Sequence, residues 1–167
     1  MEKTDKRAAV KIEPLVKEAY LAFIRNSIGG GSWRNLYALV NGEVKDILNN
    51  GELSCAYFVA TVLKTFNLIK EVHATVSGAV NDLLLFGWEE AVNPEPGDII
   101  VWTEKIDEKG EGHKHIGFYL GNNEAVSNDS KTGLISKHHL TFGEKDGRPV
   151  RTIEKILRYS NWDKIAG

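Results

Sequence analysis

The chain has 167 residues, enough for one domain with a substantial core and too few for two ordinary domains. Its formal net charge of -2 at pH 7 gives no electrostatic reason to expect nucleic acid or an anionic membrane as a partner. The single cysteine, Cys55, excludes an internal disulfide and any metal site built from several cysteines. We therefore expect one domain over residues 11–167, preceded by a flexible polar arm over residues 1–10.

The N-terminal sequence MEKTDKRAAVKIEPL is charged and lacks the apolar segment of a secretory signal. No apolar run approaches the roughly 20 residues that a membrane-spanning helix requires. The sequence accordingly predicts a cytoplasmic protein that does not interact with membranes. Release by cell lysis or by a non-standard export route stays open.

Helices are predicted in the first half of the chain. Apolar residues recur at helical spacing over residues 11–26, and the glycines of SIGGGS end that helix. The segment WRNLYALVNGEVKDILNNG is expected to form one or two short helical turns. A stronger helix is predicted after Ser54, a typical N-cap residue, along AYFVATVLKTF. A third helix is predicted over residues 78–86, with Gly87 as its C-cap.

Strands are predicted in the second half. PEPGDIIVW is expected to be a turn leading into a strand, HIGFYLG a second strand, and the two asparagines before Glu124 a tight turn into EAVSN. KTGLISKHHLTF and PVRTIEKILRY are expected to form further strands, with a helix as the alternative for the last. The loop TEKIDEKGEGHK is expected to be the most flexible segment. Helices first and strands later favour an α+β fold, with N-terminal helices packed on an antiparallel sheet.

Cys55 is predicted in the first turn of the second helix. There the positive end of the helix dipole and the free backbone N–H groups lower the pKa of a thiol. This position suits a nucleophile, because the thiolate is the reactive form. The alternative is a small buried residue, since free cysteines are among the most buried residue types.

His115 is the best candidate for a general base, because it opens the HIGFYLG strand at the rim of the expected sheet. A cysteine nucleophile requires a base within hydrogen-bond reach and a third group that orients the imidazole. Alternation along the strand places His115, Gly117 and Tyr119 on one face, and the glycine leaves room for a close approach there.

Three segments in this order resemble the motifs of NlpC-type cysteine peptidases, which belong to the papain-like group that includes the CHAP amidases. They are LSCAYFVATVLKTFNLI, PEPGDIIVW and HIGFYLGNNEAVS. In that family the cysteine starts a helix, a Pro-Gly-Asp turn opens the first core strand, and the histidine begins a strand. The resemblance covers about residues 50–135, and HIGFYLG is its most specific part. It implies a papain-like fold with the nucleophile at Cys55 and the general base at His115.

The family's third catalytic residue, usually a histidine on the next strand, falls on Ser127, with Asn128 beside it. The carbonyl oxygen of an asparagine accepts a hydrogen bond from an imidazole N–H, whereas a hydroxyl is a weaker acceptor. We therefore expect Asn128 to orient the imidazole after a one-residue bulge, with Ser127 as the second candidate.

The candidate substrate contacts lie on the segments around the cysteine. The family's Asp-Cys-Ser motif is replaced here by Ser54, Cys55 and an alanine, so Ser54 is expected to cap the helix and to contact substrate. Trp33 or Tyr37 is expected to replace the aromatic group that the family carries upstream. His73 is a candidate cleft residue, with a surface or packing role as the alternative.

The resemblance implies a hydrolase that cleaves a peptide or amide bond through a thioester on Cys55, with a peptidoglycan fragment as substrate. Backbone N–H groups at the helix start would receive the oxyanion. No cofactor and no metal is expected, because His113 with His115 is too small a set for zinc. Two alternatives stay open: an inactive binding module on the same fold, and an acyltransferase that passes the thioester to an amine or hydroxyl.

Overall fold

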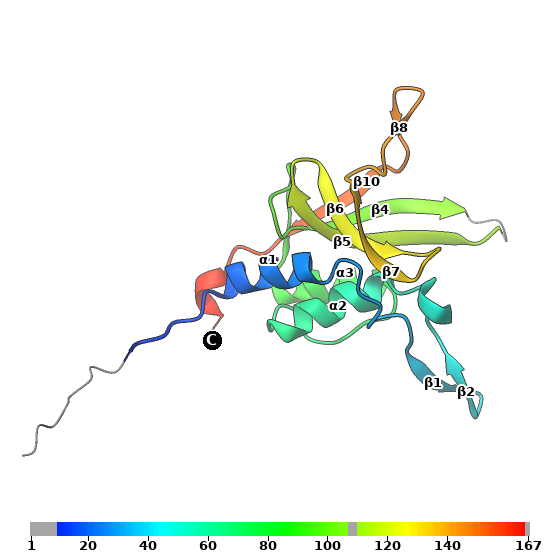
Figure 1. Cartoon of the computed structure of the whole chain (residues 1–167), viewed down its shortest axis with the longest axis horizontal. Coiled ribbons are helices and arrows are strands. Elements are labelled where there is room, and N and C mark those ends of the chain that lie inside the picture. Colours follow the sequence, from blue (N-terminus) through cyan, green and yellow to red (C-terminus); the bar gives the residue numbers. More distant parts are fainter. Residues whose placement is uncertain (1–9, 107–109, 166–167) are drawn as a thin grey trace, which may run out of the picture.

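The structure is a computed structural model that describes residues 10–106 and 110–165. In these residues, three helices lie on one side of a six-stranded antiparallel sheet (Figure 1), which confirms the predicted α+β class. The helices are α1 (Val16–Asn26), α2 (Cys55–Thr65) and α3 (Val76–Phe86). Apart from Val10, the predicted N-terminal arm lies outside the described residues. No helix in the described part of the chain is both long and apolar enough to cross a membrane.

The sheet has the strand order β3-β10-β4-β5-β6-β7, and every neighbouring pair is antiparallel. Its strands are β3 (Glu89–Glu90), β4 (Ile99–Ile106), β5 (Gly112–Gly121), β6 (Glu124–Asp129), β7 (Leu134–His139) and β10 (Ile153–Arg158). The last segment is therefore a strand and not a helix. β4 and β5 extend into the predicted flexible loop, so its described part is mostly strand, while residues 107–109 lie outside the description.

Local sequence explains where the helices begin and end. α1 starts at Val16, later than the predicted residue 11. Pro14 disfavours the helical conformation at the residue before it, and the side chains of Ile12 and Leu15 are exposed, so no burial stabilises a longer helix. α3 is capped by Thr75, whose hydroxyl accepts from the backbone N–H of Gly78. Gly87 ends that helix in the left-handed conformation (φ 108°), as predicted.

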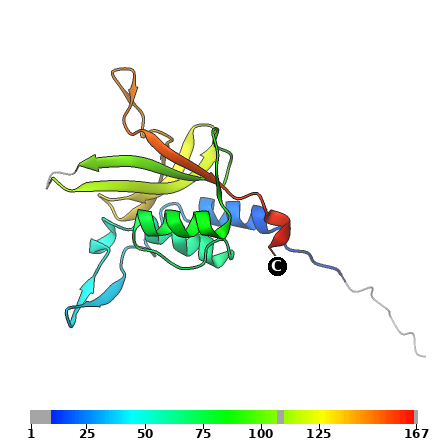
Figure 2. The same cartoon turned by 180° about the vertical axis from the view of Figure 1, so that it is seen from behind.

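The segment predicted to form one or two short helical turns, residues 33–51, has such a turn only at its end. This segment forms a hairpin of β1 (Tyr37–Val40) and β2 (Glu43–Asp46), followed by a 3-10 turn over Asn49–Gly51. The two residues between the strands, Asn41 and Gly42, both have positive φ angles of 55° and 85°. An Asn-Gly pair favours this two-residue hairpin turn. This hairpin and a second one, β8 (Glu144–Lys145) with β9 (Arg148–Pro149), project from opposite sides of the body (Figure 2).

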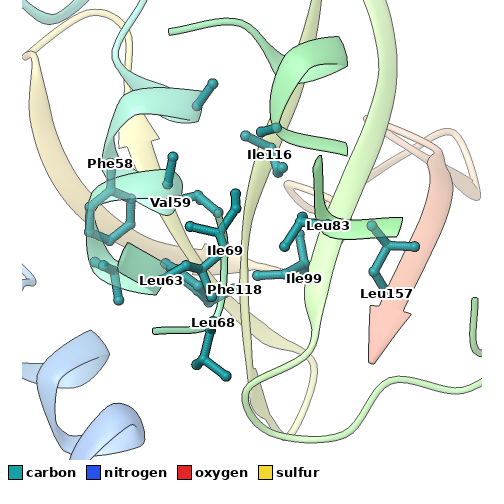
Figure 3. Close-up of a cluster of buried hydrophobic side chains, with 14 of the residues drawn as sticks. Phe58, Val59, Leu63, Leu68, Ile69, Leu83, Ile99, Ile116, Phe118 and Leu157 are labelled. Carbon is teal, nitrogen blue, oxygen red and sulfur yellow. The ribbon is translucent and has the colours of Figure 1, made fainter. Parts of the chain in front are cut away.

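The main core lies between the sheet and the helices. Apolar side chains of α2 and α3 pack on alternate residues of the central strands (Figure 3). The helices contribute Phe58, Val59, Leu63 and Leu83, and the strands contribute Ile99, Ile116 and Phe118. The opposite face carries a smaller cluster that contains Trp102, Tyr119, Ala125 and Ile156. Alternation along β5 places Ile116 on the helix face and His115 on the face of Trp102, whose ring centroid lies 5.5 Å from that of the histidine.

Candidate functional site

The start of α2 is held against the sheet by the turn that precedes it. Gly51 has a φ of 98°, and an added Cβ would lie 2.5 Å from the Cα of Gly133, in the turn between β6 and β7. The two backbones therefore approach so closely that only glycine fits at this point. Asn128 of β6 donates from Nδ2 to the carbonyl oxygen of Gly51 at 2.6 Å. These contacts position Cys55, the first residue of α2, over the sheet.

Burial and the backbone N–H groups at the start of α2 shift the pKa of the Cys55 thiol in opposite directions. The backbone N–H groups of Ile116, Ala56 and Cys55 and the charge of Arg151 all lower the pKa of the thiol, but burial is the largest effect and raises it above its ordinary value. The expected lowering of this pKa is therefore wrong. Ser54 occupies the N-cap position, but its side chain makes no capping hydrogen bond, so that expectation is wrong too.

The imidazole of His115 is held by a hydroxyl. Its Nε2 atom lies 2.8 Å from Oγ of Ser127, and its ring lies against Trp102 and Phe142. Burial, followed by the charges of Arg151 and His138, lowers the pKa of His115 to about 3. The ring is therefore neutral at physiological pH.

A second histidine completes the arrangement on the other side of Ser127. Nε2 of His138 lies 2.8 Å from the same Oγ atom, and Nδ1 of His138 lies 2.8 Å from the backbone oxygen of His139. A carbonyl oxygen only accepts, so Nδ1 of His138 carries the proton. Burial lowers the pKa of His138, which favours its neutral ring, and Nε2 is then an acceptor.

The direction of the hydrogen bonds from His138 through Ser127 determines which nitrogen of His115 carries the proton. Because Nε2 of His138 accepts, the hydroxyl of Ser127 donates to it and has only acceptor capacity left for His115. Nε2 of His115 must then carry a proton and donate to Ser127. Nδ1 of His115 is left without a proton, and no hydrogen bond to it is found among the described residues. An imidazole in this state has a free lone pair at Nδ1, but its lowered pKa makes it a weak base at neutral pH.

Asn128 does not orient this imidazole. β6 pairs with β7 from Glu124 to Asp129 without a register shift, so the bulge that would bring Asn128 toward His115 is absent there. Alternation directs Asn128 toward the helix side, where its amide binds Gly51, and leaves Ser127 beside His115. Of the two candidates for orienting His115, Ser127 is therefore the one within hydrogen-bond distance of its ring.

A cavity of about 370 Å³ opens beside the imidazoles, and its walls include His115, Ser127, His138, Phe142 and Arg151. Phe142 stacks on His138, with ring centroids 3.9 Å apart, and its φ of 60° is rare for a bulky residue. Such backbone strain persists where the surrounding structure enforces it, and it is frequent at functional sites.

The thiol of Cys55 and the imidazole of His115 are linked through the backbone of β5 and make no direct hydrogen bond among the described residues. The backbone N–H of Ile116, the residue after His115, faces the sulfur of Cys55. Nucleophile and base contacts are often loose before substrate binds, so this geometry is compatible with a catalytic pair.

The other predicted substrate contacts are not brought to this cavity. Trp33 packs edge-to-face on Phe58, with centroids 4.9 Å apart, and Tyr37 is exposed on β1. His73 pairs with Asp82 of α3 at 2.7 Å, which fits the alternative packing role. The side chain of Ser54 is fully buried.

Sequence reasoning missed His138, Phe142 and Arg151. His138 lies in KTGLISKHHLTF, which was expected only to form a strand; alternation along β7 places His138 and His139 on opposite faces. His138 lies opposite Ala125 in the β6–β7 pair, and this register brings its ring to Ser127. No local pattern marks Arg151, which precedes β10 and enters the site through tertiary structure alone.

Comparison with known proteins adds no family to this description. No family model matches the chain, and no curated protein matches it.

Proposed function

We propose that the protein is a cysteine hydrolase of peptide or amide bonds, with a papain-like NlpC-type fold, in which Cys55 is the nucleophile and His115 the general base. The observation that carries this proposal is the chain of hydrogen bonds from the backbone oxygen of His139 through His138 and Ser127 to His115. It leaves a free lone pair on Nδ1 of His115, and the backbone N–H of the next residue, Ile116, faces the sulfur of Cys55. The order of the three motifs that resemble NlpC-type peptidases supports the same assignment.

The reaction starts from a neutral thiol and a neutral imidazole. As the sulfur of Cys55 attacks the carbonyl carbon, the thiol proton moves to Nδ1 of His115. The resulting imidazolium donates from Nε2 to Ser127, whose hydroxyl donates in turn to His138. This polarised chain makes Ser127 a better acceptor than an isolated hydroxyl.

The later steps use the same groups. Backbone N–H groups in the first turn of α2, including that of Cys55, have no partner within the helix and can donate to the oxyanion. His115 returns the proton to the leaving amine, and a thioester forms on Cys55. Water then attacks the thioester, its proton passes to Nδ1, and the thiol is regenerated. We propose a cell-wall peptide as the substrate, because the motif resemblance points to peptidoglycan fragments.

An inactive binding module is the second candidate. Two observations favour it: the raised pKa of Cys55 and the missing hydrogen bond between its thiol and His115. Such a module would use the same cavity to hold a peptide without cleaving it.

The deciding experiment incubates the protein with muropeptides and follows new amino termini and fragment masses by mass spectrometry. We expect cleavage by the wild type, none by Cys55→Ala, and a loss of about 10²–10⁴-fold in His115→Gln, the usual contribution of a general base. Equal, background-level product from wild type and Cys55→Ala would reject the hydrolase. Binding of the same muropeptides by calorimetry would then support the module.

A further inference from the structure

We propose that Arg151 forms a carboxylate-binding subsite in the cavity that His115 also lines, so that the preferred substrate carries a free carboxylate close to the amide that is cleaved. This inference deepens the proposed function and rests on it, because the bound carboxylate belongs to a substrate only if the protein is a hydrolase. The subsite itself is a property of the cavity and can be tested without turnover.

Arg151 is held in a fixed orientation at the cavity wall. Its Nε donates to the backbone oxygen of Thr103 at 3.0 Å, and its Nη2 donates to that of His113 at 2.5 Å. These carbonyls belong to β4 and β5, so the two strands orient the guanidinium plane. A guanidinium has five N–H donors, and these two contacts leave others for a ligand.

The charge of Arg151 lacks an acidic partner in the described part of the chain. No carboxylate there lies within 4.0 Å of its guanidinium nitrogens, although the side chain is half-buried. Burial lowers the pKa of Arg151, and the group that opposes this effect is Cys55. Because an arginine remains charged at any physiological pH, a cation without a counter-ion stands in the cavity wall. Partly buried charges are normally paired, so the site is suited to an anion.

The remaining charges of the cavity have the same sign, with one exception. Lys105 and Lys131 also line it, and Asp129 is the only acidic residue of its walls within residues 10–106 and 110–165. The carboxylate of Asp129 already accepts from the backbone N–H of Lys131 and the hydroxyl of Thr132. A planar guanidinium binds a carboxylate through two parallel hydrogen bonds, and carboxylates are the common anionic groups of peptides. These facts together select a carboxylate as the ligand.

Two reagents that differ only in this group provide the test. Iodoacetate and iodoacetamide alkylate the same thiol, and Cys55 is the only cysteine of the chain. The ratio of their rate constants is measured by intact mass on the folded protein and on the same protein unfolded in urea. We expect the ratio to be about 10- to 100-fold higher in the folded state, the range for a charge-assisted hydrogen bond of ~1.5–3 kcal/mol.

Variants distinguish a specific contact with Arg151 from a general attraction by the positive charges of the cavity. Arg151→Met should lower the ratio to that of the unfolded chain, Arg151→Lys should keep part of it, and Lys131→Met should change it less than about twofold, since a rim charge is screened by water. Circular dichroism and the midpoint of urea unfolding show whether each variant is folded. An equal ratio in folded and unfolded wild type would overturn the inference, as would an equal loss in Lys131→Met and Arg151→Met.

The outcome is independent of the hydrolase proposal. If no muropeptide is cleaved but the ratio is high and depends on Arg151, the subsite stands and belongs to a binding module. If muropeptides are cleaved but the ratio does not depend on Arg151, the hydrolase stands and the carboxylate subsite is rejected.

Discussion

Oγ of Ser127 lies 2.8 Å from Nε2 of His115, so a hydroxyl group, and not an amide or carboxylate oxygen, contacts this imidazole. A lone hydroxyl orients an imidazole weakly, because it can turn away or donate to the same nitrogen. Here His138 accepts the hydroxyl proton, and the backbone oxygen of His139 fixes the tautomer of His138. Ser127 therefore presents a lone pair to His115 and nothing else.

This relationship predicts that His138 is a positioning residue. We expect Ser127→Ala and His138→Ala each to lower turnover by about 10- to 100-fold, the usual effect of a group that orients a catalytic or metal-bound residue. Nitrogen-15 chemical shifts of His115 should show an unprotonated Nδ1 in the wild type and a mixture of tautomers in both variants.

Ser136→Ala is the matched control, since Ser136 lies opposite Ser127 on β7 and also lines the cavity. It should leave both the turnover and the nitrogen shifts unchanged. If His138→Ala behaved like this control, the proposed role of His138 would be lost.

Asn128→Ala should affect stability more than chemistry. Its amide donates to Gly51 within a buried environment, so the substitution leaves that carbonyl without its partner. The expected loss is about 1–3 kcal/mol in the free energy of unfolding, measured in urea. Asn81→Ala, at an exposed position of α3, is the control and should change this free energy by less than about 0.5 kcal/mol. A stable Asn128→Ala protein without turnover would instead return Asn128 to the catalytic set.

Acid should destabilise the fold through the buried histidines. The pKa of His115 is lowered to about 3, so the unfolded chain binds a proton near pH 6.5 that the folded chain does not. The contribution of His115 to the free energy of unfolding is complete above pH 6.5. It decreases as the pH falls toward 3, by ~1.4 kcal/mol for each pH unit.

The measurement is urea unfolding between pH 7 and pH 4.5. The carboxylates with lowered pKa values, Asp46 and Asp82, titrate below this window. His115→Gln should flatten the decline, with the remaining slope due to His138. A wild-type stability that does not change over this range would contradict the neutral, buried state of both rings.

Cys55 should react slowly at neutral pH when no substrate is present. Burial raises the pKa of its thiol, so the alkylation rate with iodoacetamide should reach half its maximum above the ordinary thiol value of about 8.5. Arg151→Met should move this midpoint higher, because the guanidinium charge lowers the pKa of Cys55. A midpoint well below 8.5 in the wild type would show that the helix start dominates over burial after all.

Local patterns alone determined much of this protein. Apolar periodicity predicted the three helices, Gly87 predicted the end of α3, and the pair Asn122–Asn123 predicted the turn between β5 and β6, where both residues have positive φ angles. The same patterns placed a cysteine at a helix start and a histidine on a strand. These features depend on neighbours within a few residues, which is why the sequence contains them. The β1–β2 hairpin carries an equally local signal, the pair Asn41–Gly42, which the prediction of helical turns for this segment overlooked.

Only the tertiary structure decided the chemistry of the site. Whether Ser127 or Asn128 faces His115 depends on the register of β6, and the direction of the pKa shift of Cys55 depends on how deeply α2 is buried. His138 and Arg151 reach the site from β7 and from the segment before β10, brought there by the order of strands in the sheet. Register, burial and strand order arise from contacts between residues that are distant along the chain, so no local pattern contains them.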